Sequence, residues 1–395
     1  MINADSISSQ EVKSCTPGSY RLLWSGDEAY QAMIEAMNVA QTSIILETYT
    51  FSACKLGERI RSALVTACQR GVQVRVLLDS FGSLSLSDVF WGPVRSAGGQ
   101  VRWFNPLSLR RFGFRNHRKL LICDNRIAFV GGFNISAEYE GDGVNNGWRD
   151  VGLKLSEPVV HELAASFDLL FENAEFQHLR FARLRKSSLL GRLTSKEIVF
   201  CDEKTQLLLC GPGRGFQTLK PTLRKDLQNS RSAHIMAAYF LPTWRIRRTL
   251  MRMASKGGKV QLLLAGKSDV FLSQYASRVL YQKMLKAGID IYEYQPQILH
   301  AKMIVLDDVL YLGSANLDVR SLNINYELVL KLHQPTLAQE ARALFAEALT
   351  HSRKIDAETW QSSRSFIEKI KEYWAYLILA RLDPYIARLQ MRHLR

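Results

Sequence analysis

The sequence predicts an α/β fold built from two similar halves, and three observations support this prediction. Stretches with helical spacing of apolar residues alternate with short apolar runs that are typical of strands. The order of these stretches repeats, and Gly257 and His300 follow each other much as Gly71 and His117 do. A motif with His, Lys, Asp and Asn occurs once in each half. We therefore expect two pseudo-symmetric α/β/α halves that form one cleft, followed by an amphipathic helical tail.

The apolar patterns place the elements in the same order in both halves. The first half is expected to contain helices at residues 27–41 and 56–69 and strands at 42–51, 72–78 and 101–104. The second half repeats these strands at residues 232–240, 260–264 and 289–294. The predicted domains are a first half (20–179), a basic connector (180–196), a second half (197–350) and the tail (351–395).

Each half carries the motif His-x-Lys-x4-Asp and, a few residues later, a small-residue turn that ends in Asn. The copies are His117, Lys119, Asp124 and Asn134, and His300, Lys302, Asp307 and Asn316. Side chains alternate along a strand, so the His and Lys of one copy share a face and the Asp has the opposite parity. The Asp begins a turn before a second apolar run. We therefore expect a β-hairpin with Asp at its bend, where the Asp shapes the turn and does not touch a substrate.

The shared face of His and Lys suits an anionic, tetrahedral group. Lys and Asn donate hydrogen bonds to phosphate oxygens, and charge-assisted bonds of this kind are strong. Histidine can form a covalent intermediate and can transfer protons near neutral pH. Two such faces brought together would supply one His to attack phosphorus and one to protonate the leaving alcohol. His234 lies in an apolar strand without a Lys two residues later, and we interpret it as structural.

At these residues the chain resembles the phospholipase D superfamily, whose signature is His-x-Lys-x4-Asp-x6-Gly-[Gly/Ser]-x-Asn in duplicate. The first copy fits in full, whereas the second is one residue shorter between Asp307 and Gly313. This shortening is expected in the hairpin turn, away from His300 and Asn316. Within the superfamily the chain is most similar to bacterial cardiolipin synthases over roughly residues 20–350. The similarity includes the segments 45–49, 70–79, 239–242 and 313–321.

The resemblance also assigns a role to two carboxylates downstream of the motifs. Asp150 follows the first motif and Glu327 follows the second, each shortly after the Asn that ends it. A catalytic His needs a partner on its second ring nitrogen to fix its tautomer. In the family this carboxylate usually serves the His of the opposite half. That implies Glu327 for His117 and Asp150 for His300.

The charge of the chain predicts an anionic partner. The net charge is +15 with a pI near 9.6, and residues 180–196 hold six basic and no acidic residues. Further clusters are Arg110, Arg111 and Arg115, and Arg245, Arg247 and Arg248. A nucleic acid and an acidic membrane surface both fit this charge, and a basic surface without a partner is the third interpretation.

The end of the chain favours a membrane. Apolar residues from Phe366 to Leu379 follow helical spacing, with Tyr373 and Trp374 among them and Arg381 nearby. A helix docked on the protein's own core is the alternative. No apolar stretch reaches the roughly 18–20 residues of a spanning helix, and residues 1–18 lack the pattern of a secretory signal. The six cysteines lack a Cys-x-x-Cys pair, which favours free thiols over disulfides or metal ligands.

The resemblance implies a peripheral enzyme on the cytoplasmic face of a bacterial inner membrane, acting on phospholipid substrates without a metal or cofactor. His117 would attack a donor phosphatidylglycerol while His300 protonates the departing glycerol, and a second phosphatidylglycerol would then accept the phosphatidyl group. The two histidines could exchange roles. Transfer to water would make a phospholipase D, and a nuclease uses the same chemistry. No nucleic-acid recognition module is visible, so nucleic acid is not the expected substrate. The sequence leaves a protein partner unknown.

Overall fold

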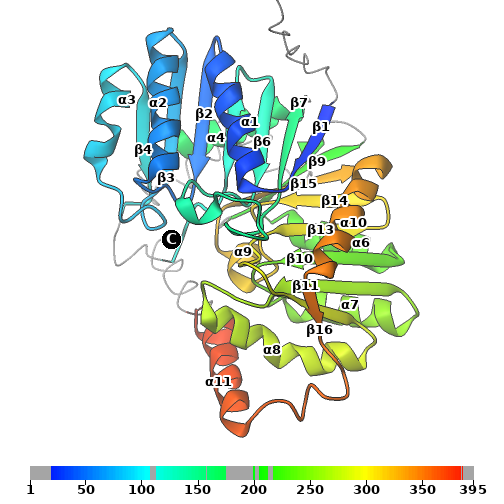
Figure 1. Ribbon diagram of the computed structural model, residues 1–395. Helices are drawn as coiled ribbons and strands as arrows, with labels where there is room; N and C mark the ends of the chain where they lie inside the picture. The colour runs from blue at the N-terminus through cyan, green and yellow to red at the C-terminus, as the bar shows by residue number, and fades with distance from the viewer. Residues whose placement is uncertain are drawn as a thin grey trace, which may run out of the picture.

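The computed structural model describes residues 19–106, 113–156, 158–174, 199–200, 204–211, 217–383 and 385. Two β-sheets with helices on their faces confirm the predicted α/β fold (Figure 1). The predicted basic connector at residues 180–196 lies outside the described residues, and so do Arg110 and Arg111.

The first sheet has seven strands in the order β1-β7-β6-β5-β2-β3-β4. Helices α1 (Gly26–Val39), α2 (Lys55–Gln69) and α3 (Gly92–Ser96) pack on one face, and α4 (Val159–Glu172) packs on the other. The strands are β1 (Ser19–Leu23), β2 (Ser43–Thr48), β3 (Gln73–Asp79), β4 (Gln100–Phe104), β5 (Leu120–Cys123), β6 (Ile127–Gly131) and β7 (Gly152–Ser156).

The second sheet has nine strands in the order β16-β12-β11-β10-β13-β14-β15-β9-β8. Helices α6 (Leu219–Asn229), α7 (Trp244–Ser255) and α8 (Phe271–Lys286) pack on one face, and α10 (Pro335–Thr350) packs on the other. The strands are β8 (Val199–Phe200), β9 (Thr205–Cys210), β10 (Ser232–Ala237), β11 (Lys259–Ala265), β12 (Asp290–Tyr294), β13 (Lys302–Leu306), β14 (Val309–Gly313), β15 (Glu327–His333) and β16 (Ser352–Lys354).

Seven strands of the two sheets correspond in order, as the repeat predicts. The series β4-β3-β2-β5-β6-β7-β1 in the first sheet matches β12-β11-β10-β13-β14-β15-β9 in the second. Gly71 and Gly257 take equivalent places at φ +88°, where each ends a helix before the next parallel strand. The second sheet adds β8 at one edge and β16 at the other, and β16 comes from the range 351–395 assigned to the tail.

The two motif hairpins also correspond. β5 pairs with β6 and β13 pairs with β14, both antiparallel, and Asp124 and Asp307 stand at the bends with positive φ. Cys123 faces Ile127 across a three-residue turn, whereas Leu306 faces Val309 across a two-residue turn. The residue missing from the second motif is therefore missing from the turn, as predicted.

One hydrophobic core joins the halves. It contains side chains from the inner faces of both sheets together with α4 and α10, which lie between the sheets. Because this core is shared, the ends of the two motif strands are held at fixed positions relative to each other. The molecule has helices on the outer face of each sheet and a helical layer between the sheets (Figure 1).

The tail forms the predicted helix, which docks on the second half. Helix α11 (Phe366–Leu377) begins with a capping box at Ser365 and Glu368, packs against α8 and buries Ala375 in the outer core (Figure 1). Its opposite face leaves Phe366, Tyr373 and Trp374 at least 55% exposed. The docked face agrees with the alternative of a helix on the protein's own core, and the exposed apolar face leaves the membrane role a prediction. Among the described residues, no helix is both long and apolar enough to cross a bilayer.

Candidate active site

The two motifs meet at a cavity of about 940 Å³, which we call the active-site cleft. His117 and Asn134 from the first half line it together with His300 and Asn316 from the second half. Both histidines are more than 90% buried. The histidine and the asparagine of each motif thus line one common cleft.

Backbone pairing between the halves brings each histidine to its carboxylate. The segment before His117 bridges to Tyr326, the residue before Glu327, and the His117 N–H donates to the Tyr326 carbonyl over 3.0 Å. The segment before His300 bridges in the same way to Arg149, whose carbonyl accepts from the His300 N–H over 2.7 Å. Short parallel contacts of this kind fix the register of both pairs.

The two carboxylates contact the histidines of the opposite halves, as the resemblance implies. Nδ1 of His117 lies 3.0 Å from Oε1 of Glu327, and Nδ1 of His300 lies 2.6 Å from Oδ2 of Asp150. Both carboxylates are fully buried. The Ser314 hydroxyl donates to Glu327, and the Val151 N–H donates to Asp150 over 2.7 Å. A carboxylate on Nδ1 leaves Nε2 of a neutral imidazole as the basic nitrogen.

Burial governs the protonation of these pairs. Burial lowers the pKa of His117 against the opposing effect of Glu327, and it lowers the pKa of His300 well below its ordinary value. Burial also raises the pKa of Asp150 to about 7, although Lys302 opposes this rise. Both imidazoles are consequently neutral at neutral pH, the form in which a histidine is a nucleophile.

The two lysines lie behind the histidines and do not line the cleft with them. Lys119 donates to the carbonyl of His117 over 2.6 Å, and Lys302 donates to the carbonyl of His300. Nζ of Lys302 also lies 3.1 Å from Nε2 of His300. Burial lowers the pKa of Lys302, and it lowers the pKa of Lys119 to about 7. An ammonium group has three N–H donors, so each lysine can keep its carbonyl contact and still donate to a phosphate oxygen, as predicted.

The two asparagines are held by equivalent backbone groups. The Thr50 N–H donates to Oδ1 of Asn134 over 3.1 Å, and the Tyr239 N–H donates to Oδ1 of Asn316 over 3.4 Å. These contacts fix the amide orientation, so that the NH₂ group of Asn134 donates to the Tyr139 hydroxyl over 2.7 Å. Each Asn therefore presents a donor toward the cleft.

Asp124 and Asp307 lie away from the cleft, at the bends of the two motif hairpins. The carboxylate of Asp124 accepts from the N–H groups of Gln41, Thr42 and Ser43. That of Asp307 accepts from the N–H groups of Arg231 and Ser232 at the start of β10. Burial alone would raise the pKa of Asp124, but its backbone donors outweigh this effect and lower the pKa. Both residues tie a hairpin bend to the neighbouring strand, as their parity predicts. Although Asp124 and Asp307 belong to the catalytic motif, neither of them lines the cleft.

Aromatic side chains surround the histidines, and some of them carried no signal in the sequence. The ring of Tyr49 lies 5.0 Å from that of His117, and the rings of Tyr139 and Trp148 lie 5.2 and 5.6 Å from that of His300. The hydroxyl of Tyr239 donates to Asp269 on the rim. Tyr139 ends a short 3-10 helix and Asp269 lies in a loop, both outside the motifs, so only folding brings them to the cleft.

The remaining sequence predictions concern His234 and the arginine clusters. The ring of His234 packs edge-on against that of Phe345 outside the cleft, which fits its structural interpretation. Arg115 is only 4% exposed and lies 3.9 Å from Asp79, so it belongs to the interior as well as to the wall of the cleft. Arg245 and Arg248 are exposed on α7, where they contribute to a basic surface.

The buried pairs lead to a first prediction. Glu327→Gln and Asp150→Asn are each expected to lower kcat by about 10²- to 10⁴-fold, because an amide no longer stabilises the protonated ring and no longer selects one tautomer. Steady-state rates with circular dichroism check this. Asp168→Asn, which breaks a half-exposed ion pair with Arg75, is the matched control and should retain full activity. Wild-type rates in both cleft variants would contradict the assignment.

The sequence of this chain is similar to those of known proteins. Residues 33–170 and 223–349 match the family described as "Cardiolipin synthase, PLD-like domain". Cardiolipin synthase 1 of Bacillus cereus is 31% identical over 367 residues, which cover 91% of this chain and 71% of that protein. Cardiolipin synthase B of Salmonella typhi is 32% identical over 366 residues, which cover 91% of this chain and 87% of that protein.

Among solved structures, the phosphatidylserine synthase of Haemophilus influenzae has a similar fold. Its TM-score is 0.73 at 13% identity, with 93% of this chain and 94% of that chain covered. At this identity the likeness concerns the fold of two joined halves.

Proposed function

Because the chain belongs to the phospholipase D-like cardiolipin synthase family, we propose that it transfers a phosphatidyl group from one phosphatidylglycerol to a second and so forms cardiolipin. The observation that carries the proposal is the pair of buried histidines on one cleft, each backed by a carboxylate of the other half. This arrangement supplies a nucleophile and an acid–base group on opposite sides of one phosphorus atom.

In the first step, Nε2 of His117 attacks the phosphorus of the donor. The phosphorus–oxygen bond to the head-group glycerol breaks, and His300 gives its proton to the departing oxygen. The products are free glycerol and a phosphatidyl group bound to His117. Glu327 accepts a hydrogen bond from the Nδ1–H of His117 and stabilises the positive charge that develops on the ring.

In the second step, His300 takes the proton of a hydroxyl on the second phosphatidylglycerol. The oxygen attacks phosphorus, the phosphorus–nitrogen bond breaks, and His117 returns to its starting form. The amide groups of Asn134 and Asn316 and the ammonium groups of Lys119 and Lys302 are proposed to stabilise the charge on the five-coordinate transition state. An anionic phosphodiester beside His300 raises the pKa of that ring, which favours the protonated form that the first step needs.

Exclusion of water decides between transfer and hydrolysis. The rings of Tyr49, Tyr139 and Trp148 enclose the two histidines and support transfer to an alcohol over transfer to water. We further propose that the enzyme works peripherally on an anionic membrane surface, at the cytoplasmic face of a bacterial inner membrane. The net charge of +15 and the exposed apolar face of α11 support this placement.

The test uses purified protein and vesicles that contain phosphatidylglycerol, with lipid products separated by mass. Cardiolipin together with one free glycerol per turnover is the expected result, and a His117→Ala/His300→Ala protein is the control. Phosphatidic acid alone would make the enzyme a phospholipase D. Cleavage of DNA without lipid turnover would make it a nuclease. Sedimentation with the same vesicles measures membrane binding, and no binding to anionic vesicles would contradict the membrane placement.

A further inference from the structure

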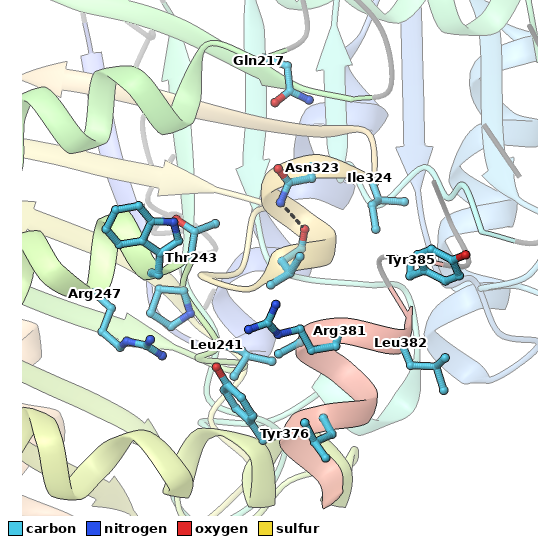
Figure 2. A pocket seen from close by; sticks show the side chains of 15 residues that line it. Gln217, Leu241, Thr243, Arg247, Asn323, Ile324, Tyr376, Arg381, Leu382 and Tyr385 are labelled. Atoms are coloured by element: carbon cyan, nitrogen blue, oxygen red, sulfur yellow. Dashed lines mark hydrogen bonds between the residues drawn. The ribbon is translucent and has the colours of Figure 1, made fainter. Parts of the chain in front are cut away.

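A second cavity lies beside the active-site cleft, and we call it the tail groove. Its volume is about 1010 Å³, and it lies between the start of α7, helix α9 (Val319–Asn323) and the end of the tail (Figure 2). Leu241 and Val319 line both the groove and the cleft. The groove therefore continues directly from the cleft.

The turn η5 (Ile378–Leu382), which directly follows α11, forms the boundary between the two cavities. Leu379 faces the cleft with Asp383, whereas Arg381 and Leu382 face the groove. The carboxylate of Asp383 pairs with Arg320 over 2.5 Å, and Arg320 also donates to the carbonyl of Gly113 in the first half over 3.0 Å. These bonds hold the tail against both halves at the mouth of the cleft.

The lining of the groove is apolar with two cations. Its apolar side chains include Leu241, Trp244, Val319, Ile324, Leu377 and Leu382. Trp244 and Leu382 are more than half exposed, which is unusual for large apolar side chains that serve only the core. Arg247 and Arg381 point into the space between α7 and the tail (Figure 2). Within the described chain, neither guanidinium pairs with a carboxylate, and no described lining residue is acidic.

This inference rests on the proposed function, which requires two phosphodiesters at one site. The donor phosphate reacts between the histidines. The acceptor phosphatidylglycerol brings its own phosphate, which does not react and stands three carbons away from the attacking hydroxyl. That second anion needs cations outside the two motifs, and its acyl chains need an apolar surface next to the cleft.

We propose that the tail groove is the acceptor subsite, in which Arg381 and Arg247 bind the unreactive phosphate of the second phosphatidylglycerol and the apolar lining holds its acyl chains. The subsite then determines specificity: an acceptor with a phosphate is captured at low concentration, whereas a small uncharged alcohol enters the cleft without using the groove. Arg381 acts on the acceptor and takes no part in cleavage of the donor.

The test compares two acceptors with the same donor. Vesicles of phosphatidylglycerol report cardiolipin formation, and added deuterated glycerol reports exchange of the head group into phosphatidylglycerol. Arg381→Gln is expected to lower cardiolipin formation about tenfold at limiting lipid, roughly the worth of one charge-assisted hydrogen bond, and to leave glycerol exchange unchanged or faster. Arg381→Lys should restore part of the loss, since it keeps the charge.

Two further variants sharpen the result. Ala380→Trp fills the groove and should give the same selective loss. Arg252→Gln removes an equal charge from α7, outside both the groove and the predicted basic cluster, and should change neither rate. Equal loss of both reactions in Arg381→Gln and Ala380→Trp, or no loss in either, would overturn the acceptor subsite. If the wild-type protein forms no cardiolipin and exchanges no glycerol, the proposed function itself fails.

Discussion

Replacing His117 by alanine is expected to lower the rate of cardiolipin formation by at least about 10⁴-fold, because no covalent intermediate forms without the nucleophile. The fold should survive, since His117 lies just before β5 and its backbone N–H donates to Tyr326 in the variant as in the wild type. Product formation on vesicles and the midpoint of thermal unfolding measure the two effects separately.

His300→Ala separates the roles of the two histidines. With a phosphatidyl 4-nitrophenol donor the leaving group needs no proton, so this variant should still release one equivalent of 4-nitrophenolate and then stop. The phosphatidyl group would remain on His117, where mass spectrometry of the peptide detects it. His117→Ala should give no such burst. A burst in His117→Ala, with the adduct on His300, would reverse the assignment.

The largest expected effect on stability comes from a buried ion pair that only the first half contains. Nη2 of Arg118 lies 3.0 Å from Oε2 of Glu47, and both side chains are about 1% exposed. The Asn116 amide donates to the same carboxylate over 2.7 Å, so the pair fixes the segment that carries His117. Burial raises the pKa of Glu47 despite the opposing charge of Arg118, so burial disfavours the charged carboxylate even beside its cation.

Arg118→Met is therefore expected to lower the free energy of unfolding by about 3–5 kcal/mol, because it leaves a buried carboxylate without its cation. The double variant Glu47→Met/Arg118→Met should recover most of this loss. Equivalent positions in the second half, Met236 and Ala301, show that an uncharged pair is compatible with the fold. Urea unfolding measures all three proteins.

A matched control is Arg21→Met, which breaks the exposed pair with Glu28 and should cost less than about 1 kcal/mol. If the single variant Arg118→Met is no less stable than this control, the buried pair does not stabilise the first half. If the double variant is as unstable as the single one, the loss comes from packing and not from the uncompensated charge.

Much of the fold could be predicted because the deciding interactions are local. The alternation of apolar residues predicted the strands, and the helical spacing predicted α1 and α2 within a few residues of their bounds. Side-chain parity along β5 and β13 also placed Asp124 and Asp307 at the hairpin bends. Parity follows from backbone geometry alone, so a sequence can reveal it without knowledge of the neighbours.

The catalytic candidates could be recognised because their motif occurs twice in the sequence. The duplicated spacing of His117 and His300, with Asn134 and Asn316, singled out the face that now lines the cleft. The role of Lys119 and Lys302 at phosphate stays a prediction, since in this structure their ammonium groups donate to the carbonyls of the histidines. A shared strand face gives the direction of a side chain, but the hydrogen-bond partner at its end depends on the surrounding packing.

The sequence by itself determined the class of fold, the two halves, the motif faces and the basic character of the chain. Only the tertiary structure decided which residues meet across the halves. The contacts of Tyr139 with His300, of Asp383 with Arg320 and of α11 with α8 join segments far apart in the chain. Such contacts depend on how the shared core positions the two sheets, and the tail groove exists only because the docked tail closes it.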